Sequence, residues 1–69
     1  MDAKAYTAAR LAEARENLSI ARAEAERTAG LEGAEGRSKH AGAKAVAKSH
    51  EKQVTYWEAE VAKANGPVG

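Results

Sequence analysis

Two long segments of the sequence carry small or apolar side chains at alternating steps of four and three residues. In the first segment these side chains are Leu11, Ala14, Leu18, Ala21 and Ala25. Charged side chains fill most of the positions between them, and steps of this kind place residues on one face of an α-helix. Asp2 is a suitable N-cap, because its carboxylate can accept a hydrogen bond from a free backbone N–H group. The pattern predicts a helix over about residues 2–28.

The second segment repeats the pattern in the later half of the chain. Its positions are Ala43, Ala47, His50, Val54, Trp57, Val61 and Ala64. The sequence Asn65-Gly66-Pro67 follows directly; glycine readily takes the left-handed conformation that ends a helix, and proline cannot continue one. We therefore expect a second amphipathic helix over about residues 41–64 and a C-terminal tail over residues 65–69.

Residues 29–40 separate the two predicted helices and contain Gly30, Gly33 and Gly36. Glycine-rich segments of this kind usually form flexible connectors. A short β-hairpin is the alternative, although the segment has little β-branched alternation to support one. The sequence thus predicts a single small all-α domain over residues 1–69, in which two antiparallel amphipathic helices are joined by a glycine-rich connector. The alternative fold adds a small degenerate hairpin to the same helices.

The alanine content of both helices indicates how closely they pack. Small side chains allow two helices to approach at the short end of the usual range, about 8 to 10 Å between axes. The predicted seam places the first-helix residues against three larger residues of the second, namely Val54, Trp57 and Val61. Periodicity alone is compatible with pairing inside one chain or between two chains.

The size of the chain favours a partner. A domain of 69 residues buries only about 60% of the surface that its unfolded chain exposes. There is no phenylalanine, and much of the 43% hydrophobic content is alanine, which buries little area. Disulfides are excluded because the chain has no cysteine. We therefore expect a homo-oligomer or a complex.

The polar residues predict no catalytic, cofactor or metal site. The serines, Ser19, Ser38 and Ser49, lie in no nucleophile motif, and no pair of carboxylates has apolar surroundings. His50 falls on the predicted seam, which favours a packing role, while His40 falls in the connector, and their spacing matches no zinc motif. No apolar run reaches the roughly 18 residues that span a bilayer. The expectation is a soluble, non-enzymatic protein that does not enter membranes.

The clearest candidate for contact with a partner is a cluster of basic residues. Residues 37–52 hold five basic side chains against Glu51 alone, a local charge of +4 within a chain of net charge +1. The five are Arg37, Lys39, Lys44, Lys48 and Lys52. A solvated helix face is the simplest interpretation, but such a row also suits an acidic protein surface or DNA phosphates. Tyr56 lies off the seam beside Trp57, and is therefore the better aromatic candidate for an external contact.

Three short stretches are similar to a known family. The sequences ARLAEA (residues 9–14), GRS (36–38) and QVTYWEAEV (53–61), in a helix, connector, helix arrangement, resemble small structural proteins of tailed bacteriophages. The arrangement and the length are those of the lambda-type W head-completion (head-tail joining) family, in which the connection is often a small β-hairpin.

The resemblance implies a location and partners. Members of that family bind beneath the portal after DNA packaging, as a homo-oligomeric ring of roughly twelve copies, and they help to retain the genome and attach the tail. By this resemblance the chain is a virion protein of the phage neck, present in the host cytoplasm during assembly. Its partners are portal and tail or neck proteins, with non-specific contact with packaged DNA. The basic cluster and Tyr56 then form the partner interface.

Two other functions remain open from the sequence. The first is a helical-hairpin module that self-associates through its alanine seam, such as a capsid-decorating or scaffold-like protein. The second is a small DNA-binding accessory protein that uses the lysines. Binding to duplex DNA that weakens steeply with salt distinguishes the second from the first.

Overall fold

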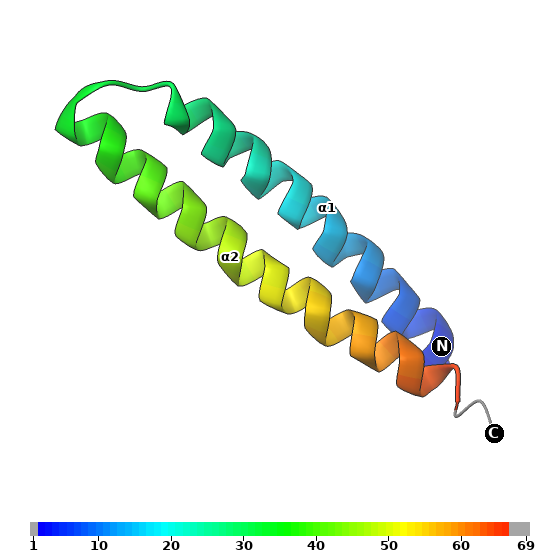
Figure 1. Cartoon of the computed structure of the whole chain (residues 1–69). Coiled ribbons are helices and arrows are strands. Elements are labelled where there is room, and N and C mark those ends of the chain that lie inside the picture. The colour runs from blue at the N-terminus through cyan, green and yellow to red at the C-terminus, as the bar shows by residue number, and fades with distance from the viewer. Residues whose placement is uncertain (1, 67–69) are drawn as a thin grey trace.

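The chain forms a long antiparallel helical hairpin. The computed structural model describes residues 2–66, and these form two helices, α1 (Ala3–Ala29) and α2 (Gly33–Ala64), which lie side by side (Figure 1). No strand occurs among the described residues. The hairpin is thin, with extents of 54 × 20 × 12 Å. The prediction of two antiparallel helices is confirmed.

The ends of α1 and α2 show why the helices begin and stop there. The backbone N–H of Ala5 donates to Oδ1 of Asp2 over 2.8 Å, so Asp2 is the predicted N-cap. At the end of α2 the N–H of Asn65 donates to the carbonyl of Val61 over 3.0 Å, and Gly66 has a φ of +82°. This left-handed conformation is the reason for a glycine at this position. The rest of the predicted tail, residues 67–69, lies outside the described residues.

The predicted connector over residues 29–40 is wrong, because α2 begins at Gly33, well before residue 41. Only residues 30–32 link the helices, and Gly33 makes the turn with a φ of +81°. A glycine inside a helix costs about 1 kcal/mol relative to alanine, so a few glycines do not prevent helix formation where tertiary packing favours it. The first turns of α2 pack against the end of α1 and extend the helix by about two turns.

Packing around Gly36 shows what the glycine contributes. Gly36 is buried, and a Cβ atom added to it would lie 2.8 Å from the carbonyl carbon and Cβ of Leu31. A real Cβ does not approach other atoms so closely, so only glycine lets Leu31 fold back onto the first turn of α2. This contact closes the turn of the hairpin.

One seam runs along both helices at uninterrupted steps of four and three. On α1 it contains Thr7, Leu11, Ala14, Leu18, Ala21, Ala25 and Thr28, all buried or half-buried. On α2 it contains Gly36, His40, Ala43, Ala47, His50, Val54, Trp57, Val61 and Ala64, all buried or half-buried. Strict alternation of this kind is the repeat of a two-stranded coiled coil. The seam residues predicted on each helix are therefore in the helix interface, and the seam extends further toward the turn than predicted.

The seam closes within one chain. Thr28 is 2% exposed, and its hydroxyl lies 3.2 Å from Nδ1 of His40. The same hydroxyl lies within donating distance of the carbonyls of Glu24 and Ala25, at 3.0 and 3.1 Å. His40 was expected in the connector, and it instead belongs to α2 and faces α1. This polar contact fixes the register of the two helices near the turn.

Candidate protein interaction surface

The hairpin has two flanks, which differ in how their charges are paired. On the first flank, Arg15 pairs with Glu58 over 3.4 Å and Arg22 pairs with Glu51 over 3.3 Å, each pair joining α1 to α2. All four residues immediately follow a seam residue in the sequence. In an antiparallel coiled coil these positions of the two helices are neighbours. The side chains are more than half exposed, so each pair contributes less than about 1 kcal/mol but favours this register.

The second flank contains the residues that immediately precede a seam residue, and we call it the neutral face. All four ion pairs made within a single helix lie on it: Arg10 with Glu13, Arg27 with Glu24, Lys39 with Glu35, and Lys63 with Glu60. Four acidic and four basic side chains give these pairs a net charge of zero. A surface of this kind neither attracts nor repels a partner by its net charge.

The exposed large hydrophobic side chains lie on this same neutral face. Among the described residues they are Tyr6, Ile20, Leu31, Val46 and Tyr56, with exposed fractions between 39% and 63%. Four of them immediately precede a seam residue. The fifth, Leu31, lies in the connector and lines a hollow with Glu35 and Lys39 of the neutral face. Apolar side chains gathered on one surface, with polar residues around them, are typical of a protein contact.

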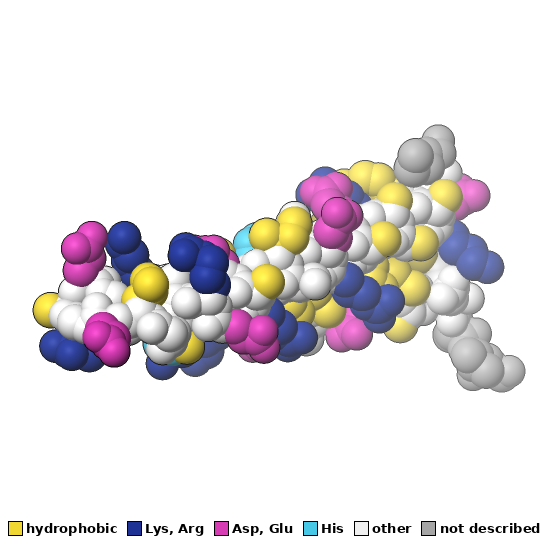
Figure 2. Space-filling model, turned by 90° about the horizontal axis from the view of Figure 1, so that it is seen from above, with side chains coloured by type: hydrophobic (Ala, Val, Ile, Leu, Met, Phe, Trp, Pro, Cys, Tyr) yellow, Lys and Arg dark blue, Asp and Glu magenta, His cyan; other side chains and the backbone are white. Residues whose placement is uncertain are grey.

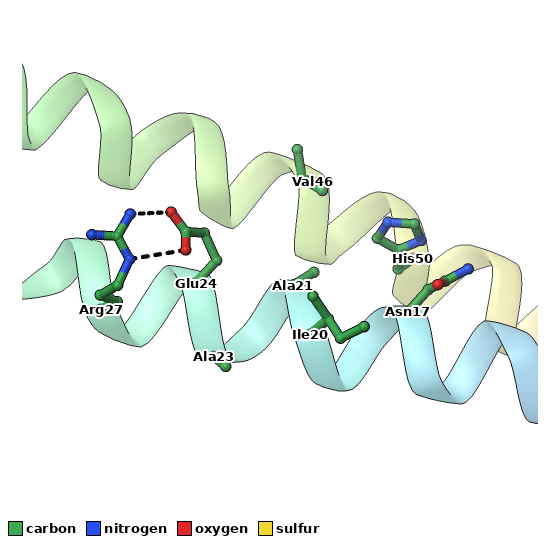
Figure 3. A pocket seen from close by; sticks show the side chains of 8 residues that line it. All are labelled: Asn17, Ile20, Ala21, Ala23, Glu24, Arg27, Val46 and His50. Atoms are coloured by element: carbon green, nitrogen blue, oxygen red, sulfur yellow. Dashed lines mark hydrogen bonds and ion pairs between the residues drawn. The ribbon is translucent and has the colours of Figure 1, made fainter.

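An open groove crosses the middle of the neutral face. It has a volume of about 580 Å³, and Ile20 of α1 and Val46 of α2 line it, with Asn17 and His50 toward one end (Figure 3). Glu24 and Arg27 lie at the other end, joined to each other on α1. His50 is half-buried, in agreement with its predicted place on the seam. The groove is open to solvent along this flank.

An aromatic cluster occupies the neutral face near the chain termini. The ring of Trp57 meets Tyr6 of α1 edge to face, with centroids 6.0 Å apart, and meets Tyr56 of α2 with centroids 4.9 Å apart. The guanidinium carbon of Arg10 lies 5.3 Å from the centre of the Trp57 ring, within the range of a cation–π contact. Trp57 is half-buried while Tyr56 is 54% exposed. Trp57 therefore lies in the seam and Tyr56 lies outside it, as the sequence indicated.

Two ion pairs of the neutral face shift the pKa values of Glu24, Arg27 and Lys63. Hydrogen bonds from Arg27 lower the pKa of Glu24, and the same bonds raise the pKa of Arg27. A hydrogen bond to Glu60 raises the pKa of Lys63. Each of these three shifts favours the charged form, so Glu24, Arg27 and Lys63 stay ionised near neutral pH.

The predicted basic cluster is divided between the two flanks. Lys44, Lys48 and Lys52, which we call the lysine row, are exposed on α2, away from the neutral face, and have no ion-pair partner among residues 2–66. Arg37 immediately follows a seam residue and belongs to the same side. Lys39 lies on the neutral face and pairs with Glu35 over 3.4 Å. The five basic residues therefore do not form one surface.

The view in Figure 2 shows acidic and basic side chains interspersed along the hairpin. Hydrophobic side chains are most numerous toward the end that carries the termini. Within the described part of the chain, no helix is long and apolar enough to cross a membrane. Residues 2–66 also contain no group of three or more metal-ligating side chains.

Comparison with family models, curated proteins and solved structures finds no match for this chain. The resemblance to the W family therefore stays a prediction.

Sequence reasoning missed Ile20 and Val46 as candidate site residues. The signal was present, because each directly precedes a seam residue, as do Tyr6 and Tyr56. This position has a meaning only once the two helices are known to pair in antiparallel orientation. The residues that precede the seam on each helix then form one surface.

Proposed function

We propose that this protein is a non-enzymatic assembly module, a helical hairpin that works by presenting its neutral face to another protein surface. The observation that supports this proposal is the coincidence of two features on one flank. The exposed large hydrophobic side chains lie there, and so do all four ion pairs that are made within a single helix. Partial burial of this flank removes apolar surface from water without leaving an unpaired charge.

The interior of the hairpin supports the same proposal. The buried hydrophobic residues are Leu11, Ala14, Leu18, Ala21 and Ala47, of which three are alanines. A core of this size contributes little hydrophobic stabilisation. Further burial of Ile20, Val46 and Tyr56 against a partner adds to it. The hairpin thus gains stability from assembly.

The test of this proposal is residue-specific cross-linking in the source cells, with the chain at its native level. A lysine-reactive reagent can report on both flanks, because Lys39 and Lys63 lie on the neutral face while Lys44 and Lys48 do not. The proposal expects protein cross-links from Lys39 and Lys63, and their loss in a chain with Ile20→Glu and Val46→Glu. Absence of any protein cross-link from the neutral face would contradict it.

A narrower form of the proposal is the head-completion role that the resemblance implies. In such a ring the neutral face would contact neighbouring copies. The exposed lysine row would contact an acidic portal surface or DNA. Residues 2–66 lack the β-hairpin often found in that family. Support for the head-completion role therefore comes from the neutral face and the lysine row. Quantitative mass spectrometry of virions tests it: a small fixed ratio to the portal protein is expected, and absence from the particle would exclude it.

The lysine row has its own test within this narrower form. Reversing the charge of Lys44, Lys48 and Lys52 to glutamate should prevent assembly on an anionic surface while leaving the helical circular dichroism signal intact. Particles of unchanged infectivity would show that the lysine row is only a solvated helix face. Loss of salt-dependent binding to duplex DNA in the same variant would instead favour the DNA-accessory function.

A further inference from the structure

We infer that the neutral face binds a second copy of this chain, with the two hairpins stacked face to face and running in opposite directions. This inference rests on the proposed function and specifies its partner. A two-fold axis that lies in the neutral face and crosses the helices at the level of Ile20 and Val46 generates the second copy. Each helix then lies over its own copy in the reverse direction.

The apolar residues are spaced for this axis. Tyr56 follows Val46 by ten residues and Gly36 precedes it by ten, so each lies about 15 Å from Val46 along α2. The axis therefore brings Tyr56 of one copy to the level of Gly36 of the other. Leu31 covers Gly36 and is 39% exposed. The tyrosine of each copy meets the leucine of the other, and the aliphatic pair Ile20 and Val46 meets its own counterpart in the centre.

The charges on α1 match under the same operation. Glu13 precedes Ile20 by seven residues and Arg27 follows it by seven, about 10 Å in each direction. The axis brings Glu13 of one copy to the level of Arg27 of the other, so opposite charges meet twice. On α2 it brings Lys39 to the level of Gln53, a neutral amide. These two pairings set no like charges against each other.

The available area is sufficient for a stable dimer. The hairpin is 54 Å long and 20 Å wide, so full overlap covers about 1,000 Å² on each copy. Stable protein interfaces bury about 800 Å² per partner. Exposed fractions of 63% at Ile20 and 51% at Val46 leave most of each central side chain for the partner to cover.

The test is the mass of the full chain in solution, measured by analytical ultracentrifugation at about 100 µM. The expected species has twice the 7.3 kDa mass of one chain. A variant with Ile20→Glu and Val46→Glu should raise the dissociation constant at least about 100-fold, since it places two carboxylates in the centre of the contact. The matched control carries Ser19→Glu and Ala45→Glu, the same charge change at exposed neighbouring positions, and should remain a dimer. Circular dichroism confirms that both variants stay helical.

Orientation is tested separately with single cysteines. A chain carrying Lys39→Cys mixed with one carrying Gln53→Cys should form the mixed disulfide on oxidation, and neither should link efficiently to itself. Efficient self-linking of either variant without the mixed product would overturn the opposite-direction arrangement.

Two outcomes separate this inference from the proposed function. A wild-type chain of single-copy mass at about 100 µM, whose neutral face still cross-links to a different protein in cells, would overturn the second-copy inference and leave the proposed function standing. A single-copy chain whose neutral face makes no protein cross-link would overturn both. Equal dissociation by the two double variants would overturn the assignment of the contact to this face.

Discussion

Replacing Gly36 with alanine tests the packing of the turn most sharply, with Gly42→Ala as its control. Both glycines lie inside α2, where alanine is favoured over glycine by about 1 kcal/mol. A Cβ added at Gly42 has nothing within 4 Å, whereas one added at Gly36 lies 2.8 to 2.9 Å from three atoms of Leu31. Two of those three atoms belong to the backbone, so a side-chain rotation cannot relieve the contact.

The two substitutions should therefore change stability in opposite directions. Gly42→Ala keeps the helical gain and should stabilise the hairpin by about 0.5 to 1 kcal/mol. Gly36→Ala has the same gain but adds an overpacking cost of about 1 to 3 kcal/mol, for a net loss of roughly 0 to 2 kcal/mol. The free energies of unfolding should thus differ by about 1 to 3 kcal/mol, which is a difference in Tm of roughly 10 °C for a domain of this size.

Thermal unfolding followed by circular dichroism measures this difference. Both variants and the wild type are compared at a concentration at which each sediments as a single copy, because Gly42 lies on the neutral face and association with a second copy makes Tm depend on concentration. A Gly36→Ala variant as stable as Gly42→Ala would refute the close approach of Leu31 to α2. The short connector would then need another explanation.

Three further predictions concern the seam and the neutral face. Leu18→Ala should destabilise the hairpin by about 2 to 3 kcal/mol in urea unfolding, since Leu18 is 8% exposed and one of two buried leucines; a loss below about 1 kcal/mol would mean that the seam is loosely packed. Thr28→Val should cost about 1 kcal/mol through loss of its contact with His40, and an unchanged midpoint would contradict a role for this contact. Arg27→Ala should raise the pKa of Glu24 in an NMR titration, because hydrogen bonds from Arg27 lower this pKa in the wild type. The stabilisation by this pair is present above the unfolded pKa of Glu24. It is lost as the pH falls through the lowered pKa of the folded state. An unshifted titration in the variant would show that the pair does not form in solution.

The helices were predictable because their seam repeats without interruption. Steps of four and three from Leu11 to Ala25 and from Ala43 to Ala64 specify the buried face of each helix, and Asp2 and Gly66 mark the outer ends. These signals are local, so they can be read without knowing the partner surface. Periodicity left pairing within one chain or between two chains open, and the short link over residues 30–32 in the structure favours the antiparallel pair within one chain.

The start of α2 was not predictable from local signals alone. Three glycines favour a flexible connector by composition, whereas the contact between Leu31 and Gly36 favours a helix from Gly33 onward. The seam also continues backward from Ala43 to His40 and Gly36 at the same steps, but neither residue has an apolar side chain that would mark it as buried. The tertiary contact of Leu31 with Gly36, and not the helix propensity of the glycines, therefore sets the start of α2.

The neutral face was not predicted for a related reason. The exposed apolar residues lie far apart in the sequence, and single surface hydrophobic residues are ordinary. Pairing of α1 with α2 brings Tyr6 onto the Trp57 ring, which Tyr56 of α2 also contacts, and places Ile20 and Val46 along one groove. The basic residues drew attention in the sequence because they are close together there, yet the structure separates Lys39 from the lysine row.

The most direct test of a self-associating neutral face is a methyl NMR dilution series on the full chain. The methyl signals of Ile20, Val46 and Leu31 should shift as the concentration falls from about 1 mM to about 10 µM, while those of Ala12 and Ala45, which are exposed away from the face, should stay fixed. Signals that all stay fixed in a chain of single-copy mass, or shifts confined to Ala12 and Ala45, would contradict the account.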